Sequence, residues 1–126
     1  MHAADTNVLV RLVTRADASQ HNAAKAFVAG GVWVSHLVLV EVAWVLQASY
    51  GFDSERLSTA LEMLLSHKAL TVQEADVALA ALSLFRKRPA LGFADCLILE
   101  VARRAGHLPL GTVDRELAKI EGARRL

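Results

Sequence analysis

Short segments of β-forming residues alternate with longer amphipathic segments along the chain, and this alternation limits the fold more than any other feature. Strands are predicted at residues 1–5, 32–34, 69–72, 108–111 and 123–126, and helices at 6–14, 19–29, 36–49, 54–66, 72–87 and 93–105, with a short helix ending at 120. Strands joined through helices pair in parallel, and a parallel sheet needs helices on both faces. The sequence therefore predicts an α/β fold with a mainly parallel sheet of about five strands.

The length and composition favour a single globular domain. The chain has 126 residues with no internal repeat, low-complexity segment or linker, so we expect one domain over residues 1–126. Hydrophobic residues make up 54%, enough for a substantial core. The net charge of +1 excludes a strongly basic nucleic-acid coat protein, but it allows an enzyme with a local basic rim.

The cysteine content and the apolar segments predict the cellular location of the protein. Cys96 is the single cysteine, so no internal disulfide can form and a reducing cytoplasmic setting is expected. The N-terminus lacks the pattern of a signal peptide. The longest apolar run, residues 37–46, is interrupted by Glu41 and is too short to span a bilayer, so no membrane association is expected.

Polar residues next to the helical segments predict where the helices begin. Ser19, Ser35 and Asp53 are expected to cap the helices that follow them. Thr71 and Glu74 have the spacing of a capping box. Ala23, Ala26 and Phe27 are predicted to lie along one face of the second helix, and the buried face of the fourth is predicted to carry Leu57, Leu61, Leu64 and Leu65.

Four of the 13 acidic residues stand apart from the others, which fall on polar helix faces, in turns, at caps, or, for Glu100, beside Arg103 and Arg104. Asp5 ends the first strand, Asp95 lies in the first turn of an apolar helix, and Asp114 follows a strand and opens a helix. A cap or a first-turn acid explains each of these three when it is considered alone. Glu41 has apolar neighbours, so we expect it to pair with an arginine such as Arg11, to be protonated or to bind a metal.

Considered together, the four acids predict a metal site. The carboxyl ends of parallel strands meet at one edge of a sheet, where ligands bind, and carboxylates gathered there repel one another unless a cation lies between them. Oxygen ligands without a histidine or cysteine cluster favour Mg²⁺ or Mn²⁺, and the five histidines lack zinc-ligand spacing. Such a site is suited to metal-assisted phosphodiester hydrolysis.

These residues also carry a family resemblance. The segments Asp5-Thr6-Asn7-Val8-Leu9, Val40-Glu41-Val42, Phe93-Ala94-Asp95 and Thr112-Val113-Asp114-Arg115 resemble the motifs of PIN-domain ribonucleases, and the length and spacing are similar to those of VapC-type toxins of bacterial toxin–antitoxin pairs. The resemblance covers nearly the whole chain. It implies a PIN-like three-layer fold and a metal-dependent endoribonuclease that cleaves RNA.

The same resemblance assigns roles to residues and partners. It implies an acidic metal site of Asp5, Glu41, Asp95 and Asp114, with Thr112, Asn7 and Ser35 supporting it through hydrogen bonds. It also implies a homodimer that a small antitoxin protein neutralises. Many relatives carry a further aspartate two residues before the alanine of the Phe-Ala-Asp motif, where this chain has Gly92, so the role of that loop is open.

Four other features of the sequence are less informative about function. Cys96 is expected to be a buried thiol, and Trp33 and Trp44 to be core residues. The segment 86–88, Arg-Lys-Arg, suits either RNA phosphates or a solvated helix end.

Three other functions remain as alternatives. An aspartate-based phosphotransfer domain would need an acid where Asn7 stands, and a receiver-like signalling domain would need paired acids near the first strand end and a late lysine. The third alternative is a catalytically inactive PIN-like interaction module.

Overall fold

The computed structural model describes residues 1–126. The chain forms two compact units, Met1–Ala75 and Asp76–Leu126, and each is described by itself. None of the helices is long and apolar enough to cross a membrane.

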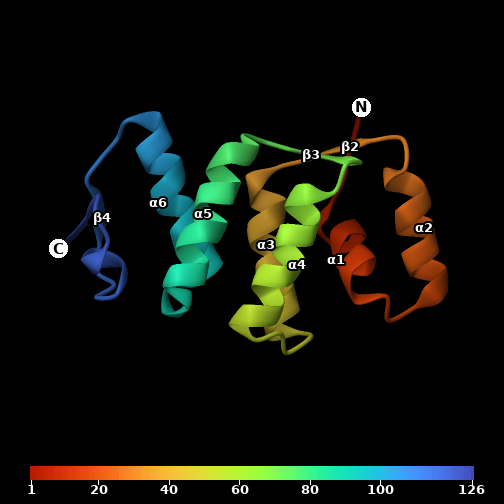
Figure 1. The fold of residues 1–126 in the computed structure, drawn as a ribbon, viewed down its shortest axis with the longest axis horizontal. Helices are drawn as coiled ribbons and strands as arrows, with labels where there is room; N and C mark the ends of the chain where they lie inside the picture. Colours follow the sequence, from red (N-terminus) through yellow and green to blue (C-terminus); the bar gives the residue numbers. More distant parts are fainter. The chain divides into compact units, whose positions relative to one another are not determined.

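The first unit contains a three-stranded parallel sheet and four helices. The strands lie in the order β1-β2-β3, and the register pairs His2 with Val32 and Val34 with Val72. All four helices lie below the strands in the view of Figure 1. The elements are β1 (His2–Ala3), α1 (Thr6–Thr14), α2 (Ala18–Val28), β2 (Val32–Val34), α3 (His36–Ala48), α4 (Ser54–Ser66) and β3 (Leu70–Val72).

Apolar residues at helical spacing form the core of this unit. The predicted buried face of α4 is confirmed for three leucines that are fully buried, Leu57, Leu61 and Leu64. The face of α2 that carries Ala23, Ala26 and Phe27 is exposed, and its buried residues are Ala24 and Val28. The small alanine side chains give this helix a weak apolar pattern, so its orientation follows from packing against α1 rather than from composition.

Side chains cap all four helices of the first unit, and Asp5 is the cap of α1. Ser35 and Asp53 cap α3 and α4 as predicted, accepting backbone N–H groups of Val38 and Arg56. Ser19 is not the cap of α2. Asp17 is, because its carboxylate accepts the N–H of Gln20 at 3.0 Å and α2 begins at Ala18.

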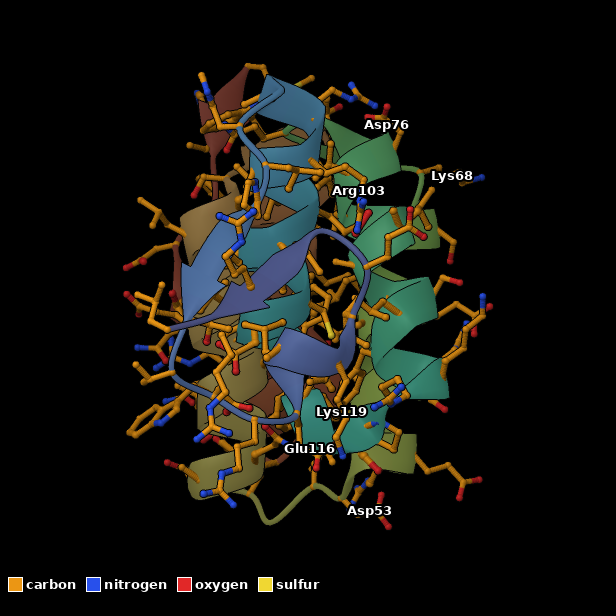
Figure 2. The ribbon with its side chains drawn as sticks, turned by 90° about the vertical axis from the view of Figure 1, so that its left-hand side faces the viewer. Asp53, Lys68, Asp76, Arg103, Glu116 and Lys119 are labelled. Carbon is orange, nitrogen blue, oxygen red and sulfur yellow. The ribbon has the colours of Figure 1, made fainter.

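The second unit holds two helices and a two-stranded parallel sheet. Phe85 of α5 and Phe93 of α6 pack edge to face, with ring centroids 6.3 Å apart. Strands β4 and β5 pair in parallel, and their arrowheads point the same way in Figure 2. The elements are α5 (Ala75–Lys87), the 3₁₀ turn η1 (Pro89–Leu91), α6 (Phe93–Ala105), β4 (Leu110–Thr112), the 3₁₀ turn η2 (Leu117–Lys119) and β5 (Ala123–Arg125).

The α/β class and the parallel pairing are confirmed, and two details differ. The five strands form two sheets, of three and two strands, rather than one. The helix predicted at 72–87 begins at Ala75, because Val72 belongs to β3 and pairs with Val34, and Glu74 has a φ of +37° that is not helical. The predicted strand 69–72 and the predicted capping box of Thr71 and Glu74 overlap. Pairing of Val72 with Val34 extends the strand, so the helix begins later.

Candidate active site

Asp5 stands at the junction between the first strand and the first helix. Pairing beyond β1 continues through Ala4, whose N–H donates to the carbonyl of Trp33 at 3.0 Å. Asp5 follows as the N-cap of α1 with extended backbone, and its Oδ1 accepts the N–H of Thr6 at 2.7 Å. The helix start thus fixes one carboxylate oxygen of Asp5 and leaves the side chain exposed to solvent.

Glu41 lies on α3, which packs against α1, and contacts the residue next to Asp5. The buried hydroxyl of Thr6 donates to Oε2 of Glu41 at 3.1 Å. The side chain of Glu41 is exposed although its sequence neighbours are apolar. Its partner is the Thr6 hydroxyl rather than Arg11.

Thr6, which follows Asp5 in the first motif, is a site residue that was not among the predicted ones. It is one of two buried polar residues, and its hydroxyl joins the helix that follows Asp5 to the helix that carries Glu41. A polar residue at the first position of a helix, directly after a candidate catalytic acid, was the available signal. The hydrogen bond itself requires the packing of α1 on α3, which the sequence does not display.

The two predicted supporting residues of the first unit have different roles. The Ser35 hydroxyl oxygen accepts the N–H of Val38 at 3.2 Å, so this side chain serves as the cap of α3. Asn7 is exposed on α1 and its side chain forms no hydrogen bond within the protein. Neither side chain forms a hydrogen bond with Asp5.

Asp95 and Asp114 interact electrostatically in the second unit. Asp95 lies in the first turn of α6 and is partly buried. Burial, followed by the negative charge of Asp114, raises the pKa of the Asp95 carboxyl above its ordinary value of 3.8. The two carboxylates are therefore close enough to repel each other, and no arginine or lysine offsets that repulsion.

A tight turn after β4 holds Asp114. Its backbone N–H donates to Oγ1 of Thr112 at 3.0 Å. Its Oδ1 accepts the N–H groups of Glu116 and Leu117 at 2.8 and 3.0 Å. One oxygen of Asp114 is thus held by the backbone, and Oδ2 is available to a ligand.

The four candidate acids therefore fall into two pairs, one in each unit. Asp5 and Glu41 are linked through Thr6, and Asp95 and Asp114 interact through their charges. No group of three or more histidine, cysteine, aspartate or glutamate side chains gathers in an arrangement that could hold a metal ion. The available ligands are carboxylate oxygens, which suit a hard cation such as Mg²⁺ or Mn²⁺ in kind.

Comparison with known protein families identifies the family of the chain. Residues 3–123 match the model of the PIN domain. The chain belongs to the PIN domain family. No curated protein and no solved structure matches it. PIN domains form a nuclease superfamily that acts on nucleic acid and typically uses divalent metals, and the match runs through all four acids.

The remaining candidates in this PIN domain are structural or lie on the surface. Cys96 is fully buried, and burial together with the charge of Asp95 raises the pKa of its thiol to about 12. The assignment of Trp33 and Trp44 to the core is wrong, because their side chains are 40% and 67% exposed. Both follow buried neighbours in apolar segments, and sequence alone does not reveal which face of a fully apolar segment meets solvent.

Several charged residues outside the four candidate acids form ion pairs with neighbouring side chains. Arg88 pairs with Glu116 at 3.7 Å, and Glu116 also accepts a hydrogen bond from Lys119 at 3.1 Å, next to it in Figure 2. The predicted pair of Glu100 with Arg103 is confirmed at 3.3 Å. These charges neutralise each other, whereas those of Asp95 and Asp114 are unpaired.

Proposed function

We propose that this PIN domain is a Mg²⁺- or Mn²⁺-dependent endoribonuclease of the cytoplasm and the toxin of a type II toxin–antitoxin pair, similar to the VapC-type toxins. Membership in a nuclease family supports the hydrolase class. The observation that carries the proposal is the pair Asp95 and Asp114, whose like charges meet without a basic partner. Like charges held together at a cost are typical of a site that binds a cation.

Asp5, Glu41, Asp95 and Asp114 would hold the metal ion, with the two pairs acting in one domain over residues 1–126. The hydroxyl of Thr6 positions Glu41 by donating to Oε2, so that Oε1 stays available. The backbone turn positions Asp114 in the same way through Oδ1. Thr112 supports this turn through its contact with the Asp114 N–H.

The chemistry follows from the charges of these groups. The four carboxylates would hold Mg²⁺ or Mn²⁺, which when bound would supply a water of lowered pKa and offset the charge of the phosphate. The carboxylates would orient the ligands around that position, and the exposure of Asp5, Glu41 and Asp114 would let a flexible single strand approach. Asn7 and Ser35 lie beside Thr6 and α3, where they would support the arrangement from its edge.

Cleavage of total RNA tests the proposal directly. We expect cleavage with Mg²⁺ or Mn²⁺ and none with EDTA. Asp5→Asn and Asp95→Asn should each lower the rate by about 100-fold or more, since they remove charge from the site. Equal cleavage in chelator would overturn metal dependence.

Three matched controls separate the site from the general acidity of the protein. Asp17 and Asp53 cap α2 and α4, and asparagine caps helices as well as aspartate does. Asp76 pairs with Arg104 on the surface. Asp17→Asn, Asp53→Asn and Asp76→Asn should keep cleavage near the wild-type rate, and comparable losses in both sets would place the site elsewhere.

Partner proteins are the second part of the proposal. We propose a homodimer that a small antitoxin neutralises, and exposed apolar side chains support such contacts. Leu37 and Trp44 on α3 are 80% and 67% exposed, which is unusual for large apolar residues of a monomer. They are separated by seven residues, two helical turns, and so share one face of the helix.

Light scattering tests this part with surface variants. We expect a dimer for the wild type, and a shift toward monomer or a loss of antitoxin binding for Leu37→Ser with Trp44→Ser. A double variant at exposed apolar positions of two other helices, Leu79→Ser on α5 with Ile98→Ser on α6, serves as the control. A wild-type monomer that binds no small partner protein would contradict the proposal.

A catalytically inactive PIN-like interaction module is the second candidate function. The absence of a group of three metal-binding side chains favours it. The RNA cleavage assay separates the two, because an inactive module binds partners without any metal-dependent cleavage. An aspartate-based phosphotransfer domain has no such support, since position 7 is asparagine.

A further inference from the structure

The last strand of the chain runs beside the strand that leads to Asp114. The register of β4 and β5 pairs Gly111 with Arg124 and Thr112 with Arg125. The pairing continues past the strand, since the N–H of Leu126 donates to the carbonyl of Thr112 at 2.9 Å. Because parallel strands end at the same edge of their sheet, the C-terminal end of β5 lies next to the turn that holds Asp114.

Contacts of the preceding loop fix this register. Nη2 of Arg103 donates to the carbonyl of Glu121 at 2.8 Å, and Figure 2 labels Arg103 close to this loop. The next residue, Gly122, has a φ of +99°, and a Cβ there would lie 3.1 Å from the Arg103 guanidinium. A one-residue slip of β5 would break these contacts, so the faces on which Arg124 and Arg125 lie are well defined.

The two arginines lie on opposite faces of the strand. Arg125 shares its face with Thr112, its direct partner, and with Leu110 and Ala123, which are partly buried. Arg124 shares its face with Leu126, whose side chain lies against Gly111 at 3.6 Å from the position of a Cβ. The hydroxyl of Thr112 accepts the N–H of Asp114, so Arg125 lies on the face of the candidate acid and Arg124 does not.

The side chain of Arg125 has no partner within the protein. It is exposed and forms no hydrogen bond or ion pair, whereas Arg103 and Arg104 of α6 are both paired with acids. An arginine that is fixed at its backbone and free at its guanidinium can bind a phosphate through two parallel N–H donors. A cation beside an acidic site also reduces the repulsion between those acids and a polyanion.

We propose that Arg125 binds a backbone phosphate of the RNA substrate next to the scissile bond, so that the C-terminal strand completes the substrate site. This inference rests on the proposed function. It assigns substrate binding to a segment outside the acidic motifs. Arg124 takes no part, although it is adjacent in sequence and carries the same charge.

Binding of an uncleaved RNA tests the proposal without relying on activity. The probe is a fluorescent single-stranded oligoribonucleotide of mixed sequence, and the protein carries Asp95→Asn to prevent cleavage. We expect Arg125→Gln to raise the Kd by about 3- to 10-fold and to lower the slope of log K against log salt by about 0.7, the value for one phosphate contact on a single strand. Arg125→Lys should keep most of the slope.

Arg124→Gln is the matched control. It should change the Kd by less than about 2-fold and leave the salt slope unchanged, and both variants should melt at the temperature of the parent. Equal effects of the two substitutions would show a diffuse charge effect and overturn the proposal, as would an unchanged salt slope for Arg125→Gln.

The outcome for this proposal is distinct from that for the proposed function. A wild-type protein that binds RNA through Arg125 but never cleaves it would refute the nuclease and retain the phosphate contact. Cleavage by the wild type with no effect of Arg125→Gln on binding would support the nuclease and refute the phosphate contact. In an active enzyme, Arg125→Gln should raise KM by about the same factor as the Kd and leave kcat unchanged, because the phosphate contact is present before and during the reaction.

Discussion

At the scale of single residues, Asp95 shows how the candidate site differs from the rest of the surface. Its carboxyl lies in the first turn of α6, where the helix dipole favours a negative charge. Burial and the charge of Asp114 nevertheless raise its pKa, so the unfavourable effects are larger than the dipole effect. The ionised side chain therefore lowers the stability of the metal-free protein.

Removing this charge should stabilise the metal-free protein at neutral pH. An acid whose pKa is raised in the folded state binds its proton more tightly there than in the unfolded chain, so the free energy of unfolding rises as pH falls toward and through the raised pKa. We expect Asp95→Asn to melt above the wild type at pH 7 in EDTA. The difference should shrink on acidification and vanish once pH lies below 3.8, the ordinary pKa.

The control is Asp76→Asn, which removes an acid that pairs with Arg104 on the surface. This variant should melt at or slightly below the wild-type temperature at pH 7, since an exposed ion pair contributes little to stability. Thermal melting followed by circular dichroism at several pH values makes the comparison. If Asp95→Asn has a lower Tm than the wild type at pH 7 in EDTA, the charge of Asp95 does not destabilise the folded protein.

Cys96 should be unreactive as long as the protein is folded. Its side chain is fully buried and its thiol pKa is about 12, so only about one molecule in ten thousand carries a thiolate at pH 8. We expect iodoacetamide to label the native protein at least about 100-fold more slowly than the urea-unfolded chain. Mass spectrometry counts the adduct, and the single cysteine makes the result unambiguous. Labelling of the native protein at the unfolded rate would contradict the buried thiol.

At the scale of helices and strands, local chemistry predicted the boundaries better than the orientations. Helix α6 was predicted over its full length, from the residue after Gly92 to a stop at Gly106, which has a φ of +82°. The start of α2 was missed because Asp17 and Ser19 both suit a cap, and the packing of α2 on α1 selects between them. Apolar residues surround Glu41 on every side of helix α3. The sequence therefore does not show that Glu41 and Trp44 lie on the face exposed to solvent.

The cap of α3 offers a test of how its start is stabilised. The Ser35 hydroxyl oxygen accepts the N–H of Val38 at 3.2 Å, and loss of such a cap costs about 1 kcal/mol. We expect Ser35→Ala to lower the free energy of unfolding by about that amount in urea. Ser49→Ala at the other end of α3, where no side-chain cap bond is formed, should change it by less than about 0.5 kcal/mol.

The same variants separate a structural role of Ser35 from a catalytic one. If Ser35 acts only as a cap, Ser35→Ala should cleave RNA at close to the wild-type rate at a temperature where both proteins are folded. A loss of cleavage with no loss of stability would instead assign Ser35 to the site. Equal destabilisation by Ser49→Ala would mean that the cap contact does not determine the cost.

At the scale of the whole molecule, the motif order carried more information than the strand pattern. The alternation of strands and helices predicted the α/β class and the parallel pairing, but it could not divide five short strands between two sheets. Pairing of strands of two or three residues depends on long-range contacts, which local propensity does not encode. The four acids were recognised from their motifs, and the family match spans both units, Met1–Ala75 and Asp76–Leu126.

Thermal melting with and without Mg²⁺ tests whether the four acids of the proposed site bind metal. Each unit supplies one acidic pair, and no group of three metal-binding side chains is present within the structure. If all four acids bind one metal site, saturating Mg²⁺ should stabilise the wild type by about 1–3 kcal/mol, seen as a rise in Tm of a few degrees. Asp5→Asn and Glu41→Gln of the first unit should each reduce this gain, and so should Asp95→Asn of the second.

The pattern across the variants decides between one site and two separate surfaces. A reduced gain in all three variants, with a single melting transition, supports one site that uses both pairs. A gain lost only in Asp95→Asn would restrict the metal to Asp95 and Asp114, where the like charges meet. Gains equal to that of the wild type in every variant would mean that these acids do not bind Mg²⁺. Glu41 would then be a surface acid that is hydrogen-bonded to Thr6, and the inactive interaction module would become the better account of the chain.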